Sequence, residues 1–291
     1  MFTATLITNP AMFLDRAMVE ALRDAMGGGD AHWLNPNHAA EFTLPKLPKN
    51  IADIWQSLQN EGVDMVVQPT EGRRKRLLLA DMDSTMIRQE CIDELADAAG
   101  VGAQVKDITA RAMNRELDFE AALRERVALL KDLPVATIDT VLAKRIHPMP
   151  GGATLVATMK AHGAYAALVS GGFTAFTAAI AAKLGFDEHR ANTLETNGST
   201  LTGTVADPIL GRDAKVAALK DLTQKLSILD EDVLAIGDGA NDLGMLELAG
   251  AGVAVHAKPA VQAQARHKIN HGDLTALLYI QGYSKDDFVT P

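Results

Sequence analysis

The sequence predicts an α/β fold: a doubly wound, Rossmann-like parallel sheet with an inserted helical cap, preceded by a small α+β domain. From residue 76 onward, short apolar runs alternate with long helical segments, and the stretch before the second run is mostly helical by period. Apolar strands separated by helices are typical of a parallel sheet covered on both faces. We therefore predict domains at residues 1–72 and 73–291, with the cap at about residues 90–148.

The amino-terminal region has its own mixed pattern of strands and helices. Alternation and helical spacing predict, in order, a strand, a helix, a loop with a strand, a helix and a strand: TATLITN, AMFLDRAMVEALRDAMGGG, HWLNPNHAAEFTLP, NIADIWQSLQNEG and VDMVVQP. Glycines end the first helix, and Asn50 is a candidate cap for the second. This unit carries no catalytic constellation. Three roles remain open for it: amino-acid binding, contacts in a homodimer, or packing against the catalytic domain.

Four apolar runs predict the strands of the parallel sheet: LLLAD, YAALVSGG, VLAIGDGAND and GVAVHAKP. Four helical segments between the first two runs predict the cap: ECIDELADAAG, VKDITARAMNREL, FEAALRERVALLKDL and VATIDTVLAKRI. Residues 163–182 carry no charge over about the length of a membrane span. Ser170-Gly171-Gly172 interrupts them, so a strand, a glycine turn and a helix are predicted instead.

Composition narrows the classes of partner and compartment. The formal net charge of −9 argues against nucleic acid or an anionic membrane as the main partner, because both require a basic surface. The single cysteine, Cys91, excludes an internal disulfide and predicts a reducing, cytoplasmic compartment. The first residues lack the basic start of a signal peptide. These features together favour a small-molecule substrate.

Acidic residues follow two of the predicted strands. Asp81 and Asp83 come directly after LLLA, and Asp238 follows VLAIG. Ligands of a doubly wound sheet bind at the carboxyl ends of its strands, so these carboxylates are expected to lie together. Their repulsion is relieved by a hard divalent cation, and Mg²⁺ prefers carboxylates, water and substrate phosphate. The sequence therefore predicts an Mg²⁺ site that binds a phosphorylated substrate.

The spacing of Asp81 and Asp83 suggests that the two carboxylates have separate chemical roles. Residues two apart in an extended chain point the same way, so Asp81 and Asp83 can both face the pocket. One carboxylate would attack phosphorus, and the other would carry a proton. Ser170 and the glycines after it can seat the phosphate, and Lys215 is a candidate for neutralising its charge. SGG and a single lysine are weak signals alone; their order after the correct elements strengthens them.

These motifs resemble the haloacid dehalogenase-like phosphotransferase superfamily, which is marked by DxDx[TV], a later strand-end Ser or Thr, a Lys and a strand-end acidic motif. Within that superfamily, four segments closely resemble the phosphoserine phosphatase family: DMDSTMIRQECIDELADAAG, RAMNRELDFEAALRERVALLKDLP, LVSGGFTAF and AIGDGANDLGML. The resemblance covers roughly residues 75–280. It implies Mg²⁺-dependent hydrolysis of phosphoserine to L-serine, the last step of serine biosynthesis, through an aspartyl-phosphate.

The resemblance also implies roles for the acidic residues. Asp81 matches the nucleophile, and Asp83 matches the general acid and base. The Mg²⁺ ligands are matched by Asp81, by the backbone carbonyl of Asp83 and by Asp238, with Asp242 as a supporting acid near the metal.

Further positions match the groups that bind substrate. The phosphate-binding groups are matched by Ser170, Gly171 and Lys215, and Asn241 matches a contact to the phosphate or on the side of the nucleophile. Glu90 and Arg126 match the pair that reads the substrate, and Phe119 matches a cap residue that closes over it. Arginine can hold the substrate carboxylate with two parallel bonds, and glutamate can accept its ammonium. From the residues alone, a surface ion pair for Arg126 and a helix-dipole role for Glu90 stay open.

Two alternatives stand beside phosphoserine hydrolysis. The same chemistry could serve another small phospho-amino acid, such as phosphohomoserine, because Arg126 and Glu90 do not fix one chain length. A non-catalytic binding module on the same fold would be expected to lack Asp81, Asp83 or Lys215, and all are present. The motifs GxxxxGK[ST], GxSxG and GxGxxG are absent, so nucleoside-triphosphate, serine-hydrolase and dinucleotide sites are not predicted.

Overall fold

A computed structural model of the chain describes residues 1–114 and 116–291. Its central feature is a six-stranded sheet in the order β12-β11-β10-β5-β6-β7, with every neighbouring pair parallel. The strands are β5 (Leu77–Ala80), β6 (Tyr165–Phe173), β7 (Glu188–Asn192), β10 (Val233–Gly237), β11 (Ala251–Val255) and β12 (His267–Ile269). The predicted α/β class with a parallel sheet is confirmed.

Helices cover both faces of this sheet because its strands are apolar on both sides. Leu78 and Ala80 of β5 join one buried core, and Leu77 and Leu79 join another. The first core is closed mainly by α7 (Gly152–Ala161), α8 (Thr174–Leu184) and α12 (Ala276–Tyr279). The second is closed by α9 (Arg212–Leu226), α10 (Leu243–Leu248) and α11 (Pro259–Gln262). Single turns of 3₁₀ helix lie at Asp230–Asp232 and Lys285–Asp287.

The segment predicted as a glycine turn is instead part of a strand. β6 continues through Ser170, Gly171 and Gly172 to Phe173, and α8 begins at the next residue. The pairing of β6 with β7 is irregular between Val169 and Phe173, so the glycines loosen the strand without ending it. The chain can therefore change from strand to helix with no intervening turn.

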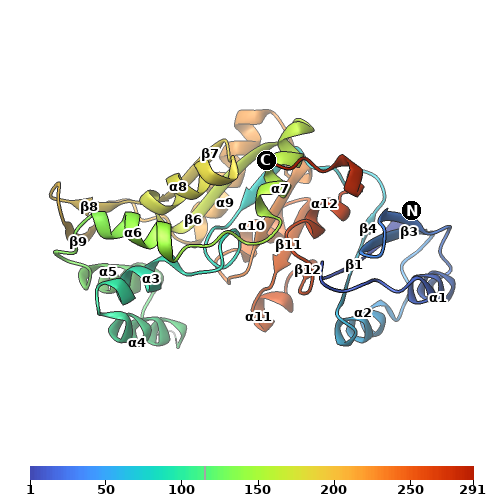
Figure 1. The fold of residues 1–291 in the computed structure, drawn as a ribbon, viewed down its shortest axis with the longest axis horizontal. Coiled ribbons are helices and arrows are strands. Elements are labelled where there is room, and N and C mark those ends of the chain that lie inside the picture. Colours follow the sequence, from blue (N-terminus) through green and yellow to red (C-terminus); the bar gives the residue numbers. More distant parts are fainter. Residues whose placement is uncertain (115) are drawn as a thin grey trace.

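Between β5 and β6 lie the helices α3 (Cys91–Ala98), α4 (Gly102–Met113), α5 (Phe119–Ala128) and α6 (Ala136–Lys144). After β7 the chain forms a hairpin of β8 (Leu194–Thr196) and β9 (Leu201–Val205). This hairpin packs against α5, so the helical cap is built from parts of the chain that are distant in sequence. The two connections to the sheet run side by side, with Ile87 bridged to Pro148. Figure 1 shows these helices at one end of the molecule and the amino-terminal unit at the other.

The amino-terminal unit is an antiparallel sheet in the order β2-β3-β1-β4 with two helices. Its elements are β1 (Phe2–Thr8), α1 (Arg16–Met26), β2 (His32–Asn35), β3 (Ala39–Leu44), α2 (Ile51–Asn60) and β4 (Val63–Pro69). The predicted loop and strand are two strands, because Asn37, at φ 65°, helps to reverse the chain. Asn50 occupies the N-cap position of α2, as predicted, but its side chain makes no capping hydrogen bond; the side chain of Asp15 caps α1 by accepting Ala17 N (3.0 Å).

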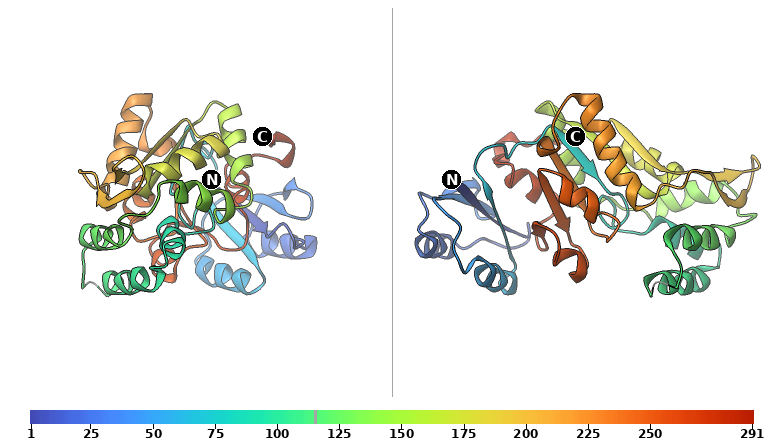
Figure 2. Two further views of the ribbon diagram at one scale, coloured as in Figure 1. Left: turned by 60° about the vertical axis from the view of Figure 1, so that its left-hand side comes forward. Right: turned by 180° about the vertical axis from the view of Figure 1, so that it is seen from behind.

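The two sheets are joined by a continuous core and by buried hydrogen bonds. Ile7 and Val66 of the amino-terminal sheet belong to the same buried cluster as Leu277 of α12. The carboxylate of Asp64, fully buried on β4, accepts the backbone N–H groups of residues 270–272 at 2.8–2.9 Å. Figure 2 shows from behind that the amino-terminal unit lies beside the red, carboxy-terminal part of the chain.

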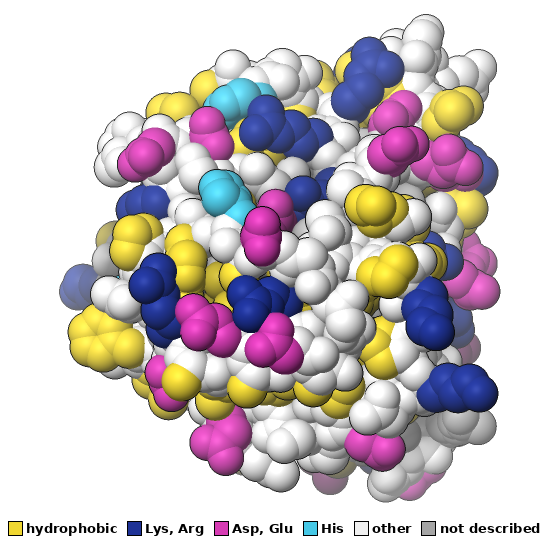
Figure 3. All heavy atoms as spheres, turned by 90° about the vertical axis from the view of Figure 1, so that its right-hand side faces the viewer, with side chains coloured by type: hydrophobic (Ala, Val, Ile, Leu, Met, Phe, Trp, Pro, Cys, Tyr) yellow, Lys and Arg dark blue, Asp and Glu magenta, His cyan; other side chains and the backbone are white. Residues whose placement is uncertain are grey.

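Two further surface features follow from the fold. Acidic and basic side chains are mixed over the face that the amino-terminal side presents in Figure 3. Among the described residues, no helix is both long enough and apolar enough to cross a membrane. Residues 163–182, which have about the length of a membrane span, lie mainly in β6 and α8 of the parallel-sheet domain.

Replacing Asp64 with alanine is expected to lower the free energy of unfolding by about 3 kcal/mol, because buried N–H groups would lose their acceptor. Urea unfolding followed by tryptophan fluorescence measures this change. Asp53→Ala, on the exposed side of α2, is the matched control and should have little effect. Equal stability of both variants would contradict the role of Asp64 in joining the units.

Candidate active site

A cavity of about 420 Å³ lies at the carboxyl ends of β5, β6 and β10, between the sheet and the cap helices. It is lined from both sides, with acidic residues and glycines of the sheet facing residues of α3, α4 and α5. The strand ends meet because β5 lies between β6 and β10, and Asp81 N donates to Ile236 O at 3.0 Å. The expected convergence of the strand-end motifs is therefore present in the structure.

Lys215 lies between two carboxylates at the floor of this site. Its ammonium group contacts Asp81 Oδ1 and lies 2.5 Å from Asp242 Oδ1, and all three side chains are almost fully buried. Burial lowers the pKa of Lys215, but the two carboxylates outweigh it and hold that pKa above its ordinary value. Burial also raises the pKa of Asp81, and Lys215 opposes this effect. The lysine is thus a permanent cation beside Asp81.

Three carboxylates gather where a metal ion could be held. Oxygen atoms of Asp81, Asp238 and Asp242 all lie within 4.8 Å of one another. Burial and the negative charge of Asp242 raise the pKa of Asp238 to about 6, while Lys258 opposes this rise. Thr85 Oγ1 donates to Asp238 Oδ1 at 3.3 Å. Carboxylate oxygens are hard ligands, and the repulsion between these three negative charges would be relieved by a divalent metal ion.

The side chain of Asp83 turns away from this cluster toward β6. Its Oδ1 accepts Cys91 N at 2.8 Å, and its Oδ2 accepts Ser170 Oγ at 3.1 Å. Burial and nearby Glu90 raise the pKa of Asp83 to about 6, although both hydrogen bonds favour its charged form. A Cβ atom at Gly172 would lie 2.8 Å from Asp83 Oδ2, so this close approach requires glycine. Asp83 is therefore held in place and can exchange a proton near neutral pH.

The cap side of the cavity carries one acidic and one basic side chain, Glu90 and Arg126, and each is held by a hydrogen bond. Glu90 Oε1 accepts the hydroxyl of Ser84 at 2.7 Å, and Ser84 itself adopts a left-handed conformation with φ 56°. Arg126, from α5, donates its Nε to Ala122 O at 3.2 Å. Burial lowers the pKa of Arg126, and Asp93 and Glu90 partly restore it. The proposed alternative of a surface pair with a neighbouring acid is not formed among the described residues.

A buried amide, that of Asn192, holds the backbone at the β6 end of the cavity in place. Asn192, only 2 % exposed, donates to Gly171 O at 2.8 Å and to Leu210 O at 3.2 Å. It also accepts Leu210 N at 2.7 Å. Phe119 covers the same backbone: a Cβ atom at Gly171 would lie 3.4 Å from its ring. The segment before α9, which carries Lys215, is thereby tied to the strand that carries Ser170.

All sequence-predicted site residues except Lys215 and Asp242 line this one cavity, and those two lie beneath it. Further side chains that the sequence patterns did not indicate also line it, among them Asp93, Thr109, Leu123 and Lys258. Lys258 follows β11, so the rule that strand ends face the site could have found it. Thr109 and Leu123 carry no recognisable motif, because only the packing of the cap helices brings them here. Asn241 lines the cavity beside Gly239.

The predicted resemblance is confirmed by comparison with known proteins. The model of the haloacid dehalogenase-like hydrolase family matches residues 78–247. A phosphoserine phosphatase of Archaeoglobus fulgidus is 40 % identical over 81 % of this chain and 70 % of its own length. A phosphoserine phosphatase of Polaromonas is 47 % identical over 70 % of this chain and 88 % of its own.

The fold extends this likeness to the amino-terminal unit. The crystal structure of a haloacid dehalogenase family hydrolase from Salmonella enterica superposes with a TM-score of 0.86 at 32 % identity. The superposition covers 96 % of this chain and 98 % of that one. Both sheets of the molecule, and not the catalytic layer alone, therefore have a counterpart in a solved structure.

Replacing Asp238 with asparagine is expected to stabilise the metal-free protein at pH 8 by about 2 kcal/mol and to change little at pH 4. The pKa of Asp238 is about 6 in the folded chain, above that of a free carboxyl. Its favourable contribution is therefore complete below about pH 3.9 and is lost as the pH rises through about 6. Thermal unfolding without divalent cations measures the effect.

The same experiment includes a control and a metal. Asp139→Asn, on the exposed side of α6, should not reproduce the gain at pH 8. Excess Mg²⁺ should stabilise the unaltered chain at pH 8 more than Asp238→Asn. An equal response of both proteins to Mg²⁺ would contradict a metal site at Asp238.

Proposed function

We propose that this chain, which belongs to the haloacid dehalogenase-like hydrolase family and is a phosphatase, hydrolyses O-phospho-L-serine to L-serine and phosphate. The observation that carries the proposal is a single cavity that contains both Asp81 and the pair Glu90 and Arg126. The relatives named phosphoserine phosphatase support the same substrate. The product assigns the reaction to the last step of serine biosynthesis.

Recognition of the amino-acid part of the substrate falls to the cap. The guanidinium of Arg126 is the cation for the substrate carboxylate, and a charge-assisted bond there is strengthened by burial. Glu90, fixed by Ser84, accepts the substrate ammonium. Phe119 closes over Gly171 and excludes water from the phosphate end. A substrate that lacks either charge leaves a polar group of this pocket unpaired, which disfavours its binding.

Asp81 is the proposed nucleophile. One of its oxygens forms a bond to phosphorus while the bond from phosphorus to the serine oxygen breaks, which leaves an aspartyl-phosphate. Lys215 favours the ionised form of Asp81 that this attack requires, since the ammonium contacts its carboxylate directly and opposes the rise in its pKa. Lys215 also neutralises negative charge on the transferred group. Ser170 Oγ and the N–H groups of the irregular end of β6 are the proposed seat of the phosphate oxygens.

Asp83 is the proposed proton carrier. In its neutral form it gives a proton to the departing serine oxygen, and the pKa of about 6 keeps part of it protonated near neutral pH. The resulting carboxylate then takes a proton from the water that attacks phosphorus. Breakage of the bond between Asp81 and phosphorus releases phosphate, restores the Asp81 carboxylate and leaves Asp83 neutral, as it was at the start.

Mg²⁺ is the proposed metal. Asp81, the backbone carbonyl of Asp83, and Asp238 would hold it, and Asp242 would support the site beside Lys215. When bound, the ion supplies positive charge for the carboxylates and the substrate phosphate. Cytoplasmic location is proposed from the single, reduced cysteine, Cys91, which is buried and 1 % exposed.

The other candidates make different demands on the site. Hydrolysis of phosphohomoserine would need Arg126 and Glu90 to accept a substrate one methylene longer, and a methylene is worth only about 10–200-fold in discrimination. The non-catalytic binding module is not retained, because the chain is a phosphatase. We propose residues 1–72 and 73–291 as the two domains, with residues 90–148 and the hairpin β8–β9 as the cap.

Phosphate release from a panel of substrates tests the proposed function. With Mg²⁺, L-phosphoserine should be hydrolysed much faster than phosphothreonine, phosphohomoserine or a sugar phosphate, and EDTA should abolish release. Faster release from phosphohomoserine would keep the chemistry and overturn the substrate. No release from any of them would overturn both.

Arg126→Ala should lower kcat/KM for L-phosphoserine by about 100-fold or more, because the substrate carboxylate would lose a charged partner. Hydrolysis of an aryl phosphate, which has no such carboxylate, should fall far less. Arg124→Ala is the matched control, since Arg124 lies on the same helix and pairs outward with Asp207. Equal losses on both substrates in Arg126→Ala would remove Arg126 from substrate recognition.

A further inference from the structure

The mechanism gives no role to one basic side chain of the candidate active site. Two basic residues are among the described residues that line its cavity: Arg126 on the cap and Lys258 on the loop after β11. Acidic residues are more numerous in the same lining: Asp81, Asp83, Glu90, Asp93 and Asp238. Within the described lining, Lys258 is therefore the only cation on the side of the sheet, since Lys215 lies beneath the floor.

The backbone of Lys258 is fixed beside the clustered carboxylates. β11 pairs in parallel with β10, so the two strands end side by side, shortly before Lys258 and Asp238. Lys258 occupies the N-cap position of α11, and its carbonyl accepts Val261 N at 2.9 Å and Gln262 N at 3.0 Å. Gln262 also donates its Nε2 to Ala257 O at 2.7 Å. The side chain of Lys258 thus starts from a defined point at the edge of the cavity.

The ammonium group of Lys258 is not committed to a carboxylate. The side chain is exposed, and within the described residues it forms no ion pair. Lys215 differs, because its ammonium lies between two carboxylates at the floor. The charge of Lys258 nevertheless acts on the site: burial and Asp242 raise the pKa of Asp238, and Lys258 opposes that rise. A free cation therefore lies close to the carboxylate cluster.

The order of the strands places Lys258 opposite the proposed phosphate seat. In the order β11-β10-β5-β6, Asp238 and Asp81 lie between Lys258 and Ser170. A phosphate group over Asp81 would therefore have Ser170 on one side and Lys258 on the other. Lys258 is then the cation that the phosphate meets on the side of the carboxylate cluster.

Phosphate is the part of the substrate that such a cation attracts. A phosphate monoester carries about two negative charges near neutral pH, whereas the chain has a formal net charge of −9 and an acidic cavity, which both repel it. A lysine ammonium is a compact charge on a flexible stem, so it can meet a phosphate oxygen without a fixed geometry. Because Lys258 is exposed, its effect should be modest and should weaken with salt.

We propose that Lys258 is a phosphate-contacting residue of the active site, whose ammonium pairs with the phosphate group of the entering substrate and of the inorganic product. The same charge repels a divalent cation near Asp238, so Lys258 favours anions and disfavours metal ions within one cavity. This role rests on the proposed phosphate and metal sites, but it does not depend on the serine part of the substrate.

Lys258→Gln in the full chain tests this role through two ligands of opposite charge. Inorganic phosphate, measured as an inhibitor of aryl phosphate hydrolysis with Mg²⁺, should inhibit about two- to fivefold more weakly. Mg²⁺, titrated calorimetrically into the chelator-treated chain, should bind about two- to fivefold more tightly. Lys258→Arg keeps the charge and should leave both constants nearly unchanged. A purely structural role of Lys258 predicts weaker binding of both ligands.

The salt dependence of catalysis gives a second readout. For an aryl phosphate, Lys258→Gln should raise KM by more than it lowers kcat. The ratio of kcat/KM between the unaltered chain and Lys258→Gln should approach one as salt increases, because the Debye length falls from about 10 Å at 0.1 M to about 3 Å at 1 M. A ratio that is independent of salt would contradict an electrostatic role.

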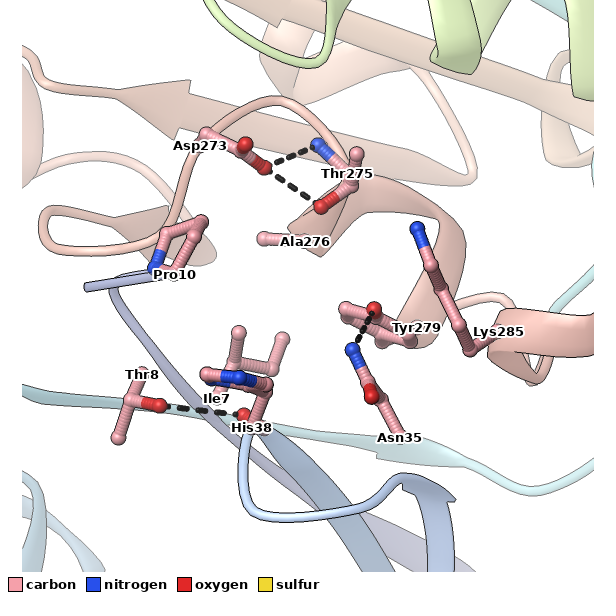
Figure 4. A pocket seen from close by; sticks show the side chains of 10 residues that line it. All are labelled: Ile7, Thr8, Pro10, Asn35, His38, Asp273, Thr275, Ala276, Tyr279 and Lys285. Atoms are coloured by element: carbon pink, nitrogen blue, oxygen red, sulfur yellow. Dashed lines mark hydrogen bonds between the residues drawn. The ribbon is translucent and has the colours of Figure 1, made fainter. Parts of the chain in front are cut away.

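Lys285→Gln is the matched control, because Lys285 is also an exposed lysine that lines a cavity. That cavity, of about 380 Å³, lies between the amino-terminal sheet and α12 (Figure 4), and it shares no lining residue with the candidate active site. Lys285→Gln should change neither binding constant.

Three results would each overturn the proposal: equal shifts in Lys258→Gln and Lys285→Gln, shifts of the same sign for phosphate and Mg²⁺, or unaltered phosphate inhibition in Lys258→Gln. Hydrolysis of the aryl phosphate without hydrolysis of L-phosphoserine would overturn the proposed substrate alone, because neither ligand in this test contains serine.

Discussion

The catalytic layer depends on one buried interaction, the ammonium of Lys215 between the carboxylates of Asp81 and Asp242. Removing one partner of a buried ion pair typically costs about 3–5 kcal/mol, because the remaining charge is left uncompensated. Lys215 supplies one positive charge against the three clustered carboxylates. The two negative charges that remain are what a divalent cation can satisfy.

This constraint explains how distant parts of the chain are arranged. The pairing of β5 with β10 brings Asp81 beside Asp238, and α9 delivers Lys215 from a segment braced by Asn192. Gly172 has no side chain because Asp83 must approach the backbone of β6. The same few contacts therefore balance the charges of the site and fix the ends of the strands that line the cavity. The cap helices face these strand ends across the cavity and contribute Arg126.

Features set by local pattern could be predicted from the sequence. Apolar runs marked the central strands, and acidic residues at their ends indicated that Asp81 and Asp238 converge, because parallel strands share an edge. Prediction failed where tertiary pairing overrides local preference: the glycines of β6 remain in a strand because Val169 and Phe173, on either side of them, pair with β7. Thr109 could not be found, since no local signal marks a residue that only helix packing brings to the cavity.

The proposed mechanism rests on covalent transfer of the phosphoryl group to Asp81. The direct measurement is rapid acid quenching during turnover of L-phosphoserine, followed by peptide mass spectrometry of the quenched chain. A nucleophilic Asp81 predicts a gain equal to one phosphoryl group on the peptide that contains it, located at that residue and absent without substrate. Turnover with no modified peptide at any quench time, or modification at a different residue, would contradict this mechanism.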